Sequence, residues 1–185
     1  FLQNQPVAGK TGTTDDAGYC FTSAYNRDGD EIYTVILNST TTDQRFTDTA
    51  TLANWYYGHK ITVAIANTQE KTANGNPLMA RISQTDWTDK TIDATLADPA
   101  AQATVFSLAG EVTEKVSYDD LSGTVHVGDK VGSVTLKQDG TKIAVMDLVA
   151  DEEGTGPNPI ECLGRRIDNR PLTAESETVA KAPEV

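Results

Sequence analysis

The residues with the clearest chemical potential lie near the beginning of the chain, where positions 9–14 read G-K-T-G-T-T. On a strand, a Lys-Thr-Gly triplet places an ammonium group beside a hydroxyl, and the glycine leaves open space next to both. An extended peptide can lie along the edge of such a strand while the two side chains contact its charged or polar end. We therefore expect this stretch to form one side of a peptide-binding site.

The elements that must position this motif are three strands followed by a helix. Asp28-Gly29 lies between the second and third strands and is a common hairpin signal. A polar loop precedes the helix, in which Asp43 or Thr42 can provide the cap. The predicted strands span 6–13, 19–25 and 31–37, and the predicted helix spans 44–57.

The third predicted strand carries apolar side chains on both faces. Tyr33, Val35 and Leu37 alternate with Ile32 and Ile36. A sheet of this kind needs cover on both sides, and one helix covers only one. We therefore expect the rest of the layer to come from outside this chain, and predict an exposed apolar face or self-association that covers it.

The remainder of the chain changes character and predicts a small all-β sandwich. Short β-branched segments recur between Gly, Asn, Asp and Pro residues, and Asp139-Gly140 marks one hairpin. Beyond residue 151 we expect a linker, a possible short amphipathic helix at 158–167 and a mobile polar tail. The predicted fold class is α+β and mostly β, with divisions at 1–58, 59–151 and 152–185. The expected strands are 61–65, 78–83, 91–96, 102–107, 111–118, 130–137 and 142–149.

Composition excludes several classes of function. The chain has 15 basic and 27 acidic residues and a net charge of −12, which disfavours nucleic-acid binding. His59 and His126 have no partner pattern, so neither a metal nor another cofactor is expected. Cys20 is expected to be a small buried hydrophobe, although pairing with Cys162 stays open.

The motif and its flanks together resemble the serine-type D-alanyl-D-alanine carboxypeptidases, which are low-molecular-mass penicillin-binding proteins. The resemblance covers about residues 5–57 and rests on G-K-T-G-T-T, on A-G-Y-C-F at 17–21, and on Arg45-Phe46 ahead of L-A-N-W at 52–55. Residues 122–132 resemble the family's C-terminal β domain more loosely. This implies the C-terminal part of a transpeptidase-like domain, followed by the β domain.

The resemblance also implies an activity, partners and a location. The family removes the terminal D-Ala from peptidoglycan stem peptides through a serine acyl-enzyme and binds β-lactams, outside the cytoplasm at the cell envelope. It implies possible membrane association through the C-terminal tail. By motif position, Lys10 would be a fixed catalytic charge, and Thr11 and Arg45 would hold the substrate carboxylate. The Thr13 N–H would be an oxyanion donor, and Gly12 would keep the strand edge open.

One departure from the family pattern decides the expected activity. Neither S-x-x-K nor S-x-N occurs among the 185 residues, and the first methionine is Met79. We therefore expect a piece of a longer or processed protein that is inactive alone and lacks the N-terminal part of its catalytic domain. Two alternatives stay open: a non-enzymatic, membrane-proximal β module, and a segment of a related transpeptidase or β-lactamase.

Overall fold

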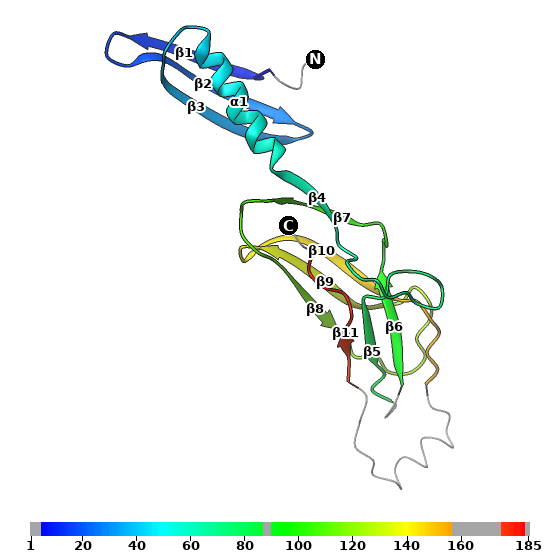
Figure 1. Ribbon diagram of the computed structural model, residues 1–185. Coiled ribbons are helices and arrows are strands. Elements are labelled where there is room, and N and C mark those ends of the chain that lie inside the picture. The colour runs from blue at the N-terminus through cyan, green and yellow to red at the C-terminus, as the bar shows by residue number, and fades with distance from the viewer. Residues whose placement is uncertain (1–4, 87–89, 157–174, 184–185) are drawn as a thin grey trace. The chain divides into compact units, whose positions relative to one another are not determined.

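The structure is a computed structural model that describes residues 5–86, 90–156 and 175–183, and it is mostly β with one helix (Figure 1). The chain divides into two compact units, Phe1–Lys60 and Ile61–Val185. The strands of each unit form their own sheets.

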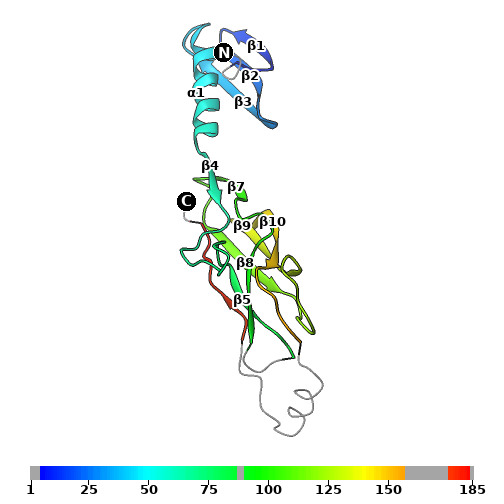
Figure 2. The same cartoon turned by 90° about the vertical axis from the view of Figure 1, so that its right-hand side faces the viewer.

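The first unit is a three-stranded antiparallel sheet with a helix on one face, as the sequence predicts (Figures 1 and 2). The Asp28-Gly29 hairpin has positive φ at both residues, 52° and 86°, which is the backbone that an Asp-Gly turn favours. The sheet order is β1-β2-β3. The elements are β1 (Ala8–Thr14), β2 (Gly18–Arg27), β3 (Asp30–Ser39) and α1 (Gln44–Gly58).

The start of α1 has the predicted cap position but not the predicted capping hydrogen bond. The cap position is Asp43, but its side chain makes no capping hydrogen bond. Instead, the Gln44 N–H donates to the hydroxyl of Thr41 at 3.0 Å. The Thr41 hydroxyl thus accepts from a free N–H group of the first turn from two residues before the cap position, and sequence spacing does not distinguish these neighbouring polar residues.

A cluster of three buried hydroxyls joins α1 to the sheet. Ser23 on β2 lies 2.7 Å from Thr34 on β3 and 3.0 Å from Thr49 on α1, measured between hydroxyl oxygens. The Thr34 and Thr49 hydroxyls lie 2.5 Å apart. Because each hydroxyl can both donate and accept, the cluster satisfies three polar groups that would otherwise be buried without partners.

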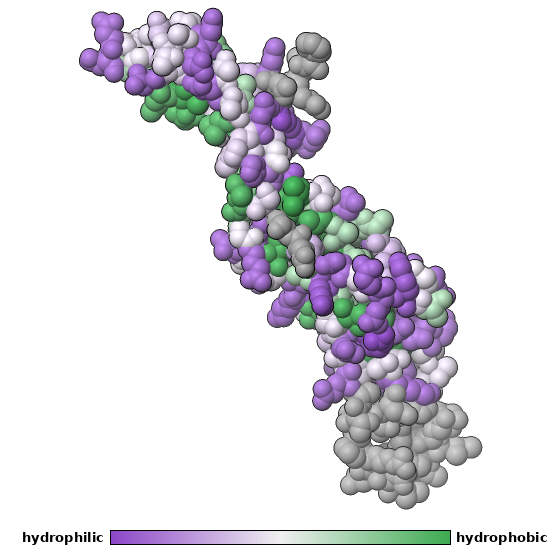
Figure 3. Space-filling model, viewed as in Figure 1, coloured by the Kyte–Doolittle hydropathy of each residue, from purple (hydrophilic) through white to green (hydrophobic). Residues whose placement is uncertain are grey.

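The opposite face of β3 is exposed, as the sequence predicts. Tyr33, Val35 and Leu37 are 73%, 57% and 71% exposed, whereas Thr34 between them is buried under α1. Figure 3 shows hydrophobic surface on the first unit. Within the described residues, α1 therefore covers one face of this sheet and leaves the other to solvent.

The second unit is all β, as predicted, and has one main core. A six-stranded antiparallel sheet has the order β11-β5-β6-β10-β9-β8, and β4 pairs with β7 in a separate two-stranded sheet. Buried side chains of β7, including Val105, belong to the same core as those of the larger sheet. The strands are β4 (Lys60–Ala64), β5 (Ala80–Ser83), β6 (Thr91–Leu96), β7 (Gln102–Phe106), β8 (Val112–Tyr118), β9 (Lys130–Gln138), β10 (Thr141–Ala150) and β11 (Glu177–Thr178).

The C-terminal tail corrects the expectation of a mobile end. Residues 175–183 return to the sheet, where Glu177 and Thr178 pair with β5 and Ala180 is only 7% exposed. A two-residue strand among polar residues has too short a pattern to be recognised in sequence. The predicted helix at 158–167 and Cys162 lie outside the described residues.

The hydroxyl cluster leads to a stability prediction. Replacing Thr49 with valine keeps the shape of the side chain and removes one hydroxyl, while Ser23 and Thr34 remain bonded to each other. We expect T49V to lower the opening free energy of α1 by about 1 kcal/mol, the net value of a typical hydrogen bond. Native-state hydrogen exchange of the α1 amides measures this within the first unit.

Thr51 provides the matched control, since it lies on the exposed side of the same helix and its hydroxyl donates to the Thr47 carbonyl at 2.9 Å. The same substitution there should change the opening free energy by less than about 0.5 kcal/mol. Equal effects of T49V and T51V would show that the buried cluster adds nothing beyond the loss of a helix-surface hydroxyl.

Candidate ligand-binding site at strand β1

Strand β1 lies at one edge of the three-stranded sheet and carries the K-T-G motif. Its register places Thr11 opposite Phe21 and Thr13 opposite Tyr19 on β2. Since side chains alternate along a strand, Thr11 and Thr13 share the α1 side of the sheet, and Lys10 and Gly12 belong to the other side. The motif therefore presents groups to both faces along a single edge.

Arg45 reaches this edge from the first turn of α1. Its Nη1 donates to the Thr13 hydroxyl at 3.3 Å, although the two residues are 32 positions apart. The guanidinium carbon lies 4.9 Å from the centre of the Phe46 ring and 5.9 Å from that of Tyr19. Aromatic rings offer a cation a favourable but weak partner, so they orient the guanidinium without neutralising it.

The charge of Arg45 is largely buried and has no acidic partner. The residue is 9% exposed, and its Nε is buried without a hydrogen bond. It makes no ion pair with any residue that the structure describes. Burying a guanidinium without a counter-charge is costly, and a bidentate anion is the partner that its planar fork fits best. The arrangement is therefore suited to a carboxylate ligand.

Lys10 does not meet Arg45. Its side chain is exposed, and its Nζ donates to the backbone carbonyl of Thr11 at 2.6 Å. In this chain the two cations therefore lie on opposite faces of the sheet. A ligand lying on the strand edge would instead have Lys10 on one side and Arg45 on the other.

The two glycines of β1 have different surroundings. A Cβ at Gly12 would have no heavy atom within 4 Å, so this part of the strand is open. A Cβ at Gly9 would lie 2.6 Å from the Phe21 ring, so this glycine is required by internal packing. Only the openness at Gly12 remains available to a ligand.

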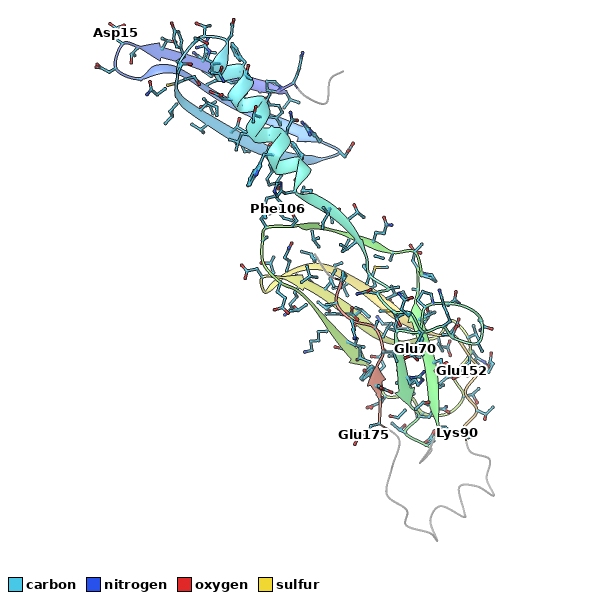
Figure 4. The ribbon with its side chains drawn as sticks, viewed as in Figure 1. Asp15, Glu70, Lys90, Phe106, Glu152 and Glu175 are labelled. Carbon is cyan, nitrogen blue, oxygen red and sulfur yellow. The ribbon has the colours of Figure 1, made fainter. Side chains whose placement is uncertain are left out.

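Tyr19 is the site residue that sequence reasoning did not assign. The sequence places it on a strand face with other aromatic residues, but nothing local connects it with Arg45. The link between Tyr19 and Arg45 comes from the β1–β2 register, which puts Tyr19 opposite Thr13 and thus near the same guanidinium. The turn that fixes this register includes Asp15, labelled in Figure 4.

Among the residues that the structure describes, no group of three or more His, Cys, Asp or Glu side chains is placed to hold a metal ion. The described helix is not long and apolar enough to cross a membrane. Cys20 is a half-buried free thiol whose Sγ lies 3.3 Å from the Ala17 carbonyl oxygen.

No protein-family model matches the sequence, and no curated protein matches it significantly. Several solved structures match this chain. D-alanyl-D-alanine carboxypeptidase DacD from Francisella tularensis is 20% identical over 80% of this chain and 36% of its own, with a TM-score of 0.41. Penicillin-binding protein 5 from Haemophilus influenzae is 18% identical over 78% and 41%, with a TM-score of 0.40.

A peptidoglycan synthesis regulatory factor, PBP3, from Streptococcus pneumoniae is 21% identical over 78% of this chain and 42% of its own, with a TM-score of 0.41. The chain is thus similar in structure to part of each protein and spans about two fifths of their lengths. At these identities the similarity concerns the fold alone.

The two glycines give a direct structural prediction. G9A should lower the opening free energy of the β1–β2 ladder by about 1–3 kcal/mol, because the new methyl group overlaps the Phe21 ring. G12A, the matched substitution three residues later, should change it by less than about 0.5 kcal/mol. Hydrogen exchange of the β1 and β2 amides compares them, and a destabilised G12A would show that this edge is not open.

Proposed function

We propose that this chain supplies one wall of the active site of a serine-type D-alanyl-D-alanine carboxypeptidase. In this proposal, β1 and Arg45 hold the terminal carboxylate of a peptidoglycan stem peptide or the equivalent acid group of a β-lactam. The observation that carries the proposal is the buried guanidinium of Arg45, which lies beside Thr13 on the K-T-G strand without an acidic partner. The resemblance of G-K-T-G-T-T and its flanks to this family indicates the substrate class.

The chemistry follows from the two sides of the strand edge. A peptide paired along β1 would place its terminal carboxylate on the α1 side, where Arg45 and the Thr11 and Thr13 hydroxyls can bind it with charge-assisted hydrogen bonds. The Thr13 N–H would stabilise the oxyanion that forms at the carbonyl of the penultimate D-Ala. The open space at Gly12 lets the peptide backbone approach the strand.

Lys10 would act on the other side of the edge. A fixed ammonium there favours loss of a proton from a nearby serine, which attacks the carbonyl and releases the terminal D-Ala. Water then hydrolyses the acyl-enzyme. The sequence has no S-x-x-K and no S-x-N, so the serine, its lysine and the second serine would come from another part of the parent protein, extracytoplasmic and associated with the cell envelope.

A peptide titration tests whether the chain itself binds a terminal carboxylate. With ¹⁵N-labelled protein, an N-acetylated peptide ending in D-Ala-D-Ala should shift the NMR signals of Thr11, Thr13 and Arg45, with a Kd on the order of 1 mM because one wall offers few contacts. The same peptide with a C-terminal amide should cause no comparable shift. R45Q should weaken binding about tenfold or more, since it removes a charge-assisted hydrogen bond.

Two further variants make the titration specific. R27Q removes another guanidinium of the same unit, one that donates to Asn54 at 2.6 Å and lies 4.3 Å from the Tyr57 ring centre, and it should leave the peptide shifts unchanged. G12V should block the peptide without unfolding the strand, because a side chain there meets only the ligand. Equal binding of acid and amide, or equal binding by wild type and R45Q, would overturn the proposal.

A labelling experiment tests the division of the catalytic centre. Incubation of this chain with a fluorescent penicillin should give no covalent band on a denaturing gel, because the chain lacks the nucleophile motif. The longer protein that we expect to contain the chain should be labelled. A labelled band from the chain alone would show that its nucleophile lies here, and an unlabelled parent protein would favour a non-enzymatic module.

A further inference from the structure

Glu114 on β8 is a half-buried acidic residue whose carboxyl group the proposed function does not use. Both of its carboxyl oxygens are shielded from solvent and have no hydrogen-bond partner within the described residues. Its register partner on β9 is Leu136, which is fully buried in the core. A carboxyl group in such surroundings is tolerated far better in its neutral form than as an anion.

The C-terminal segment, residues 175–183, runs between the two ends of β8. Figure 4 labels Glu175, with which the segment begins. At one end of β8 the Tyr118 and Thr178 hydroxyls lie 2.5 Å apart. At the other end Val112 lines the same groove as Ala182. Since Glu114 lies between Val112 and Tyr118 on the same strand face, the stretch between Thr178 and Ala182 covers it.

The segment is held more lightly than the strands beneath it. Its strand β11 pairs with β5 through only two residues. Beyond β11, the N–H groups of Val179 and Ala180 donate to the Met79 carbonyl, at 2.8 and 3.1 Å. The Lys181 N–H donates to the Asn67 carbonyl at 3.1 Å, and the Asn67 side chain donates to the Ala182 carbonyl at 3.0 Å. By contrast, β8 pairs with β9 along seven residues. The segment is therefore the element whose departure would admit water to Glu114 at the lowest cost.

The charged side chains near Glu114 do not offset the cost of burying a negative charge on its carboxyl group. Lys115 alternates to the opposite face of β8, as Lys137 does on β9, and Lys181 of the C-terminal segment is exposed. Glu111 precedes the strand and is exposed. Burial alone raises the pKa of the Glu114 carboxyl from its ordinary value of 4.5 to about 7, with no contribution from a neighbouring charge.

We propose that Glu114 is a pH-sensitive latch for the C-terminal segment, which stays docked over the neutral carboxyl and is released when the carboxyl ionises and takes up water. The direction of this pH dependence follows from proton binding, because Glu114 holds its proton more tightly when the segment is docked than when it is released. Docking is fully favourable below pH 4.5, weakens as the pH rises, and loses this contribution as the pH passes about 7. Across this interval the opening equilibrium constant should rise on the order of 10²-fold.

Hydrogen exchange on the 185-residue chain tests the latch. Protection factors of the Val179, Ala180 and Lys181 amides are measured from pH 4.5 to 8.5 and corrected for the intrinsic exchange rate. They should fall with rising pH, while those of the β9 and β10 amides change far less. In E114Q, where the side chain cannot ionise, the segment should stay protected throughout this range.

Two variants complete the design. E111Q removes an exposed carboxylate just before β8 and should keep the wild-type pH dependence. Y118F removes the contact with Thr178 and should lower protection at every pH without moving the midpoint. The proposal would be overturned by any of three results: protection of the segment in the wild type that does not depend on pH, a pH dependence that survives in E114Q, or an equal loss of protection in β9 and β10.

Discussion

The burial of one sheet face under α1 is the constraint on which the first unit depends. Three strands and one helix form a small layer pair, so the contact between them must satisfy both apolar and polar groups. The Ser23–Thr34–Thr49 hydroxyl cluster satisfies the polar ones inside that contact. Because this contact fixes the helix on the sheet, it also fixes where Arg45 lies, and the candidate site follows from the packing.

The position of Arg45 shows how an acidic chain can hold a buried positive charge. The chain carries twelve more acidic than basic residues, yet in the part that the structure describes none of the acids pairs with this guanidinium. Its partners are two aromatic rings and one hydroxyl, which orient the group but leave its charge uncompensated. This uncompensated charge is the observation on which the proposed ligand site rests.

The second unit also contains an ionisable group that is shielded from solvent and has no compensating partner among the described residues, in this case the carboxyl group of Glu114. Its sheet runs from β11 at one edge to β8 at the other, and the Tyr118–Thr178 contact brings residues of these two edge strands together. This link between the edges is made by side chains. In the proposal above it holds the C-terminal segment over Glu114, so docking of the segment carries an electrostatic cost that depends on protonation.

The sequence by itself determined the elements and the motif. Alternation and hairpin pairs predicted every described strand except β11 to within about two residues, with 91–96 matching β6, because these signals act between near neighbours. It also predicted the exposed side of β3 and placed Lys10, Thr11, Gly12 and Thr13 in one motif. Arg45 was assigned to the same site by the family resemblance. Only the tertiary structure decided that Arg45 meets Thr13 while Lys10 turns to the other face, and that the C-terminal segment returns over Glu114. Those facts depend on strand register and on contacts between residues far apart in the chain, which local sequence patterns do not encode.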